Sequence, residues 1–133
     1  MENKYKHMDY VQSVISRMAS NSFYLKGWNI TIIAAIVALS FKESDWRIYS
    51  CALVLNFVFW FLDAYYLKQE KLFRELYNKI SKISDDHLVD FSMNTSDFKK
   101  KVPAIPCLMI KNLSITPLYF SISFILLVLI HIV

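Results

Sequence analysis

Three apolar stretches, each about as long as a membrane crossing, constrain the fold of this chain more than any other feature. They run roughly over residues 23–41, 46–67 and 113–133. A helix needs about 20 mostly apolar residues to cross a hydrocarbon core of about 30 Å. Because backbone polar groups in lipid must pair within the chain, the sequence predicts an all-α membrane protein with three transmembrane helices.

Composition narrows the class of protein further. Apolar residues make up 56 % of the 133 residues, above the roughly 45–50 % of soluble domains. The single glycine is Gly27, whereas the phosphate-binding loops of P-loop and Rossmann enzymes need several glycines. The two cysteines, Cys51 and Cys107, lack CxxC spacing. We therefore expect buried free thiols near opposite membrane faces and no metal site.

The charges that flank the apolar stretches predict the orientation of the chain. Residues 42–45 form a short link with one basic and two acidic residues, so the segment 22–67 is expected to be an antiparallel transmembrane hairpin. Region 68–112 carries nine basic and six acidic residues, and the first twenty residues carry three basic ones. Basic flanks face the cytoplasm, which puts both regions inside and the C-terminus outside. Aromatic side chains near the predicted interfaces are expected to form belts: Trp28, Trp46, Tyr49, Tyr65, Tyr66 and Tyr119.

Two segments outside the spans show helical periodicity. Residues 1–21 are expected to form an amphipathic cytoplasmic helix that enters the first span. Its apolar positions are Met8, Val11, Ile15 and Met18. The second span has no stop signal, so one helix is expected from about Trp46 to Ile83, with a long cytoplasmic extension. The extension carries an apolar stripe that needs a partner, which is either the N-terminal helix or a neighbouring subunit.

The segment that leads to the third span is expected to be irregular. Residues 84–86 resemble a break between helices, and residues 92–101 form a polar loop that ends in a basic cluster. Pro103 and Pro106 are expected to keep the following stretch out of regular helix. The third span is expected over 113–133, although Thr116 followed by a proline is also a helix start. From there the helix would be about 25 Å long.

Polar side chains inside the spans are candidate functional groups, because they are costly in lipid. Asn56 and Asp63 lie seven residues apart and so share one helical face. Two roles are open for them: both line a water-filled pore, or Asp63 forms a structural ion pair with Lys26 at similar depth. The small polar residues of the first and third spans are typical of helix–helix contacts.

The densest basic run, Lys99–Lys101, has two interpretations. It anchors the chain to anionic lipid headgroups, or it belongs to a nucleotide or oligonucleotide site with aromatic stacking. The candidate ligand residues are Lys71, Arg74, Tyr77, Lys99, Lys100 and Lys101. No catalytic constellation is recognisable, so we expect no enzyme activity and no cofactor.

Two stretches resemble a known family: RMASNSFYLKGW at 17–28 and FWFLDAYYLKQEKLFRELY at 59–77. They resemble the SLATT-like small bacterial membrane effectors of nucleotide-signalling anti-phage defence, including the Hailong-type effector. The resemblance implies an oligomer in the bacterial inner membrane that depolarises the membrane and arrests growth. It also implies a nucleotide or oligonucleotide regulator, a nucleotidyltransferase as functional partner, and a pore near Asn56 and Asp63.

Three spans cannot enclose an aqueous path, so a channel requires a homo-oligomer, for which we expect a tetramer. Two other functions remain open. The chain is a structural or scaffolding subunit that recruits a cytoplasmic partner through the 68–83 stripe, or it is a small proton-linked transporter that uses Asp63 and His131.

Overall fold

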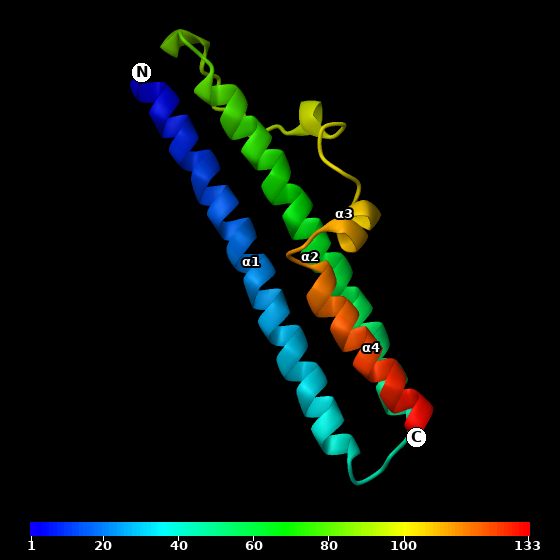
Figure 1. Cartoon of the computed structure of the whole chain (residues 1–133). Helices are drawn as coiled ribbons and strands as arrows, with labels where there is room; N and C mark the ends of the chain where they lie inside the picture. The colour runs from blue at the N-terminus through cyan, green and yellow to red at the C-terminus, as the bar shows by residue number, and fades with distance from the viewer.

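The computed structural model describes residues 1–133 and is all-α (Figure 1). Four helices follow one another: α1 (Glu2–Ser40), α2 (Trp46–Ser81), α3 (Ile105–Lys111) and α4 (Thr116–Ile132). Two single 3₁₀ turns, η1 (Asp86–Leu88) and η2 (Ser96–Phe98), lie between α2 and α3. Helices α1 and α2 are long and apolar enough to cross a membrane, and α3 with α4 forms a bent pair that could be a third span.

Helices α1 and α2 form an antiparallel hairpin along nearly their whole length (Figure 1). The predicted amphipathic helix 1–21 and the first span are one unbroken helix of 39 residues, about 58 Å long. Helix α2 has 36 residues and ends at Ser81, so its predicted extension beyond the span is confirmed within two residues. At its start, the carboxylate of Asp45 accepts a hydrogen bond from the backbone N–H of Arg47 at 2.9 Å, which caps the helix.

The part of the hairpin that lies beyond the predicted spans is made of the N-terminal half of α1 and the C-terminal part of α2 from residue 68. This distal half has its own apolar core, the distal core. Val11 and Ile15 of α1 pack with the apolar stripe of α2, and the loop before α3 covers the cluster. The other buried members are Leu72, Leu76, Ile80, Phe98 and Val102. Of the two partners expected for the stripe, the N-terminal helix is therefore the one that covers it within the single chain.

Helices α3 and α4 correct two sequence predictions. Residues 105–111 are helical despite Pro106, because this proline lies in the first turn of α3, where its missing N–H would have no helical partner. The third apolar helix begins not at 113 but at Thr116, the other start predicted from the sequence, with Pro117 in its first turn. The two helices are bent by 77°, and the 17 residues of α4 reach only about 25 Å.

Helix α4 packs along the part of α2 that is predicted to be membrane-embedded. One cluster joins Trp60 and Ala64 to α3 and the start of α4, and another joins Tyr49 and Ala52 to Ile33 of α1 and to the middle of α4. The opposite faces of these helices expose many large apolar side chains, including Phe57, Phe61, Phe120 and Phe124. Such a surface is suited to contact with lipid.

Three sequence predictions about individual side chains are wrong. Cys51 is exposed rather than buried, whereas Cys107 is half-buried, and both thiols are free. Tyr49 and Tyr119 do not belong to an interfacial belt, since only 2 % and 0 % of their surfaces are exposed. Both tyrosines lie between helices.

Candidate functional site

A network of buried polar side chains joins α1, α2 and α4 inside the otherwise apolar bundle. Its centre is Asp63 of α2, which is 0 % exposed. The Nζ atom of Lys26 lies 2.8 Å from Oδ2 of Asp63, and the phenol of Tyr119 donates to the same oxygen at 3.0 Å. The hydroxyl of Ser22 donates to Oδ1 of Asp63. Lys26 also donates to Ser22 at 2.8 Å, so the four groups form a closed charged layer.

A second layer of the network consists of neutral groups. The amide of Asn29 donates to Oδ1 of Asn56 at 2.7 Å. The amide of Asn56 donates in turn to the hydroxyl of Ser123 at 2.9 Å and to the backbone oxygen of Tyr119 at 3.1 Å. Asn29 and Asn56 are both 0 % exposed, and Oδ1 of Asn29 has no hydrogen-bond partner. This layer therefore ties the same three helices together one to two turns away from the charged one.

Residue spacing explains why the two layers stack. Positions three, four or seven apart fall on the same face of a helix. In α1 the spacing from Ser22 to Lys26 is four residues and from Lys26 to Asn29 three. In α2 Asn56 and Asp63 are seven apart, and in α4 Ser123 is four beyond Tyr119. Each helix therefore contributes one polar stripe, and the three stripes meet along the bundle axis.

The two layers lie at different depths of the predicted span. Asn56 follows the start of α2 by ten residues, or about 15 Å, which is the middle of a hydrocarbon core of about 30 Å. Asp63 lies about 10 Å further along α2, near the end of the predicted span. The neutral layer is thus central, and the charged layer is close to the face from which the N-terminal half of α1 extends.

Of the two interpretations of Asp63, the ion pair with Lys26 is the arrangement present in the single chain. The Lys26 side chain keeps 21 % exposure. Neither Asn56 nor Asp63 faces outward, because both are fully buried and bonded to groups of the same chain. Side chains in this arrangement do not line a path to a neighbouring subunit.

The residues predicted to bind an anionic ligand are not gathered in one place. Arg74 is exposed and pairs with Glu70 of its own helix at 2.7 Å, and Tyr77 packs against the distal apolar core. Lys99 and Lys100 are exposed, and Lys71 is half-buried. Of the six, only Lys101 lines a hollow of about 400 Å³ beside the end of α2.

Two lysines that line this hollow were not among the predicted ligand residues. Lys79 and Lys82 line it together with Lys101 and two acidic side chains. The ammonium groups of Lys79 and Lys101 lie 5.9 and 5.8 Å from the ring centre of Phe98, within the range of cation–π attraction. Lys79 lies in the last turn of α2, and Lys82 follows three residues later, directly after the helix end. This spacing is the signal that would have joined Lys79 and Lys82 on one face.

The structure also bears on the other two functional alternatives. Leu72 and Leu76 are 3 % and 4 % exposed, so these two residues of the 68–83 stripe are covered within the chain. His131 is exposed in the last turn of α4, two turns beyond Ser123. Nowhere in the structure do three or more His, Cys, Asp or Glu side chains lie so that they could hold a metal ion together.

Comparisons with protein-family models, with curated protein sequences and with solved structures find no match for this chain.

Proposed function

We propose that the chain is a non-enzymatic membrane effector that assembles into an ion-conducting homo-oligomer and depolarises the bacterial cytoplasmic membrane. One observation carries the proposal: a Lys–Asp pair and a tyrosine are buried together between three apolar helices. Ionisable groups at such depth are expensive and mark functional sites by default. A buried ion pair adds little net stability, and apolar residues of similar size would stabilise the bundle equally well or better. A chain that needed only to span lipid would therefore have no use for the pair.

The small net contribution of the ion pair to stability suggests how a pore opens. Desolvation opposes most of the Coulomb attraction of a buried pair, so an arrangement in which Asp63 and Asn56 exchange their internal partners for water lies within a few kcal/mol. In this proposal the present arrangement is closed. Opening turns the polar stripes of α1, α2 and α4 toward a shared axis of the oligomer, for which a tetramer is our working number.

The regulator in this proposal is a nucleotide or short oligonucleotide on the cytoplasmic basic region, made by a nucleotidyltransferase partner. The resemblance of 17–28 and 59–77 to SLATT-like effectors supports the class of regulator and a role in anti-phage defence. The basic excess of 68–112 supports a cytoplasmic position for that region, with the N-terminus inside and the C-terminus outside. Growth arrest follows from the lost membrane potential.

Ion flux through vesicles reconstituted with the purified protein tests the proposal. Asp63→Asn and Asn56→Leu are expected to change the conductance or its ion selectivity while the protein stays helical and monodisperse. Ser121→Ala is the matched control, because Ser121 is exposed and donates only to a carbonyl of its own helix. Absence of flux in the wild type at every nucleotide tested, or equal flux in all four proteins, would contradict the proposed role of the network.

A further inference from the structure

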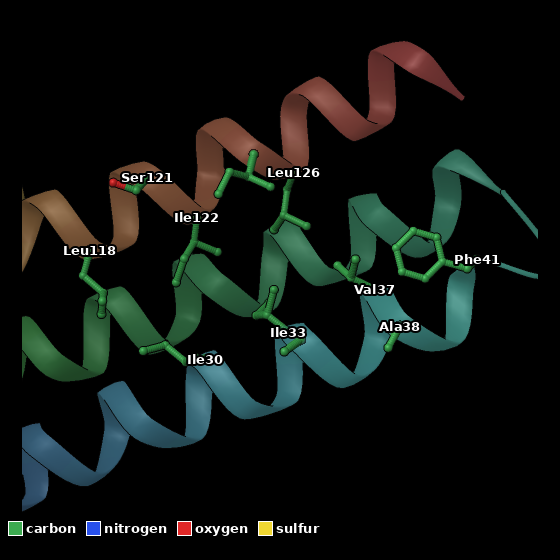
Figure 2. A pocket seen from close by; sticks show the side chains of 11 residues that line it. Ile30, Ile33, Val37, Ala38, Phe41, Leu118, Ser121, Ile122 and Leu126 are labelled. Carbon is green, nitrogen blue, oxygen red and sulfur yellow. The ribbon is translucent and has the colours of Figure 1, made fainter.

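The short helix α3 lies across the bundle rather than along it. Helix α4 runs alongside α1 and α2 (Figure 2), whereas α3 is bent by 77° from α4. Its seven residues form a helix about 10 Å long, which at this angle advances only about 2 Å along the axis of α4. Helix α3 therefore adds almost nothing to the length that α4 spans, and it lies close to the plane of a membrane that the bundle crosses.

The level at which α3 meets α2 coincides with one edge of the predicted hydrocarbon core. Leu108 of α3 is buried in one cluster with Trp60 and Ala64 of α2, and Leu67 packs against the same cluster. These residues of α2 lie about 21 to 32 Å from the start of the helix at Trp46. Because α2 is expected to enter the core at about Trp46 and the core is about 30 Å thick, α3 lies at the opposite edge, next to the distal half.

The side of α3 that faces away from α2 exposes apolar side chains. Ile110 is 69 % exposed, and Leu113, in the link that follows α3, is 91 % exposed. Pro106 is also exposed and shares a helical face with Ile110, four residues later. No other part of the chain covers these groups, whereas acyl chains at the edge of the core would bury them. A helix that lies flat with an apolar side in this boundary is typical of interfacial membrane helices.

Three lysines without acidic partners lie at about the same level. Lys111, the last residue of α3, is exposed and lies about 100° around the helix from Ile110. Lys68 and Lys71 follow, by one helical turn, the two residues of α2 that pack last against the α3 cluster. None of the three lysines takes part in an ion pair within the chain. Free cations at this depth match the phosphates of anionic lipid headgroups.

The basic run Lys99–Lys101 lies at a different level. Phe98, directly before it, packs with Leu76 and Ile80, which lie about 45 to 51 Å from the start of α2. This is about 15 Å or more beyond the edge of the core, whereas the headgroups add only about 5–8 Å to each side of a bilayer. The lysines of the run therefore lie beyond the headgroup layer that α3 reaches.

We propose that α3 is an interfacial helix that holds anionic phospholipid in the leaflet next to the distal half, which is the cytoplasmic leaflet of the proposed topology. Ile110 and Leu113 lie among the acyl chains, and Lys111 binds the headgroup phosphate together with Lys68 and Lys71. The proposal rests on the membrane embedding of the proposed function but not on ion conduction or on a regulator.

Site-directed spin labelling tests the depth of α3. The protein, with both native cysteines replaced by serine, is reconstituted in phosphatidylethanolamine–phosphatidylglycerol vesicles. Ile110→Cys and Leu113→Cys each carry a nitroxide, whose collisions with oxygen and with a water-soluble nickel chelate are compared. Phe61→Cys, at a site on the predicted span that is 49 % exposed, is the control for lipid contact. Ser96→Cys, in an exposed loop, is the control for water.

The labels at 110 and 113 are expected to collide more with oxygen than with the nickel chelate, as the label at 61 does. If the label at 61 is shielded but those at 110 and 113 are as open to the chelate as the label at 96, the interfacial position of α3 is overturned alone. A label at 61 that is as open as the one at 96 would overturn the membrane embedding and the interfacial helix together. Leu113→Cys, outside the helix, carries the test if Ile110→Cys does not fold.

Lipid retention tests the lysines. Native mass spectrometry counts the phosphatidylglycerol and phosphatidylcholine molecules that stay on the protein after mild detergent releases it from mixed vesicles of these two lipids. Lys111→Gln is expected to lower the preference for phosphatidylglycerol about fivefold, the factor that corresponds to about 1 kcal/mol for one lysine near the surface.

Lys100→Gln is the matched control, since it removes the same charge from the exposed 99–101 run. It should change the preference less than about twofold, because its distance from the headgroups exceeds the Debye length of about 8–10 Å. Equal effects of the two variants, or an unchanged preference in Lys111→Gln, would overturn the assignment of the headgroup to α3.

Discussion

The strongest energetic prediction concerns the ion pair between Lys26 and Asp63. Removing one partner of a buried pair typically costs about 3–5 kcal/mol, because the other charge stays buried without compensation. In Lys26→Met the carboxylate of Asp63 still accepts hydrogen bonds from Ser22 and Tyr119. We therefore expect a loss at the low end of that range, about 3 kcal/mol.

The reciprocal change is expected to cost less. In Asp63→Asn the lysine loses its partner, but its side chain is 21 % exposed and can turn toward water. The new amide retains one oxygen for the donors of Ser22 and Tyr119. The expected loss is about 2 kcal/mol. The double variant Lys26→Met/Asp63→Asn buries no unpaired charge, so it should also lose only about 2 kcal/mol, which gives a coupling energy of about 3 kcal/mol.

Unfolding of the purified protein in mixed micelles, followed by tryptophan fluorescence, measures these values. Trp60 stacks on Tyr119 with ring centres 6.0 Å apart, so the share of the emission that comes from Trp60, one of three tryptophans, reports on the network. Helical content from circular dichroism before unfolding controls for misfolded variants. A coupling energy below about 0.5 kcal/mol, within the additivity expected of independent sites, would refute the reasoning that the two charges depend on each other.

Three further predictions concern other parts of the fold. Asn56→Leu removes one accepted and two donated hydrogen bonds and should cost about 2–4 kcal/mol in the same unfolding assay; a loss under 1 kcal/mol would count against the neutral layer. Leu76→Ala in the distal core should cost about 3 kcal/mol and raise proteolysis of the N-terminal half, whereas Arg74→Ala, at an exposed site, should stay within about 0.5 kcal/mol of wild type. Hydrogen bonds from the N-terminal ammonium and from the N–H of Lys4 lower the pKa of Asp86 below its usual value of 3.8. A folded-state pKa below the unfolded one means that this contact stabilises the fold above the unfolded pKa and is lost as pH falls through the folded value. The protection of the Lys4 amide, corrected for the intrinsic exchange rate at each pH, should therefore fall in wild type as the pH drops below the usual carboxyl value, and Asp86→Asn should show low protection at every pH.

The sequence carries enough information to predict the hairpin and the ion pair. Helix α2 has neither proline nor glycine between Trp46 and Ser81, so nothing interrupts its periodic pattern. Lys26 and Asp63 lie at similar distances from the same end of their spans, and two opposite charges at one depth in lipid have few other partners. Depth alone therefore made the ion pair one of the two roles predicted for Asp63.

The third member of the charged layer could not be predicted in the same way. A tyrosine near the end of an apolar segment fits an interfacial belt as well as a buried hydrogen bond. Only the packing of α4 on α2 distinguishes the two for Tyr119, and that packing depends on the bend between α3 and α4. The bend lies at residues 112–115, directly before Pro117. A proline is tolerated at a helix start, but it does not determine the angle at which two helices cross.

The basic residues were the least predictable part of the chain. Lys99–Lys101 form a run in the sequence, but a run in a loop does not specify which helix face it meets. The loop places Phe98 on the distal core, and this contact brings Lys101 to Lys79 and Lys82. Long-range packing, not local sequence, decides which lysines are neighbours.

The accessibility of Ser123 to water tests most directly the central claim that the buried network opens when the protein conducts. In a variant with Cys51→Ser and Cys107→Ser, Ser123→Cys introduces a thiol at a site that is 7 % exposed, within the neutral layer. Ser96→Cys, in the exposed loop, is the control that should react with a membrane-impermeant thiol reagent in every state. We predict that the thiol at 123 is unreactive in vesicles without ion flux and reacts once flux is switched on. A thiol that stays unreactive while ions flow would contradict the claim, because the network would then remain dry in the conducting state.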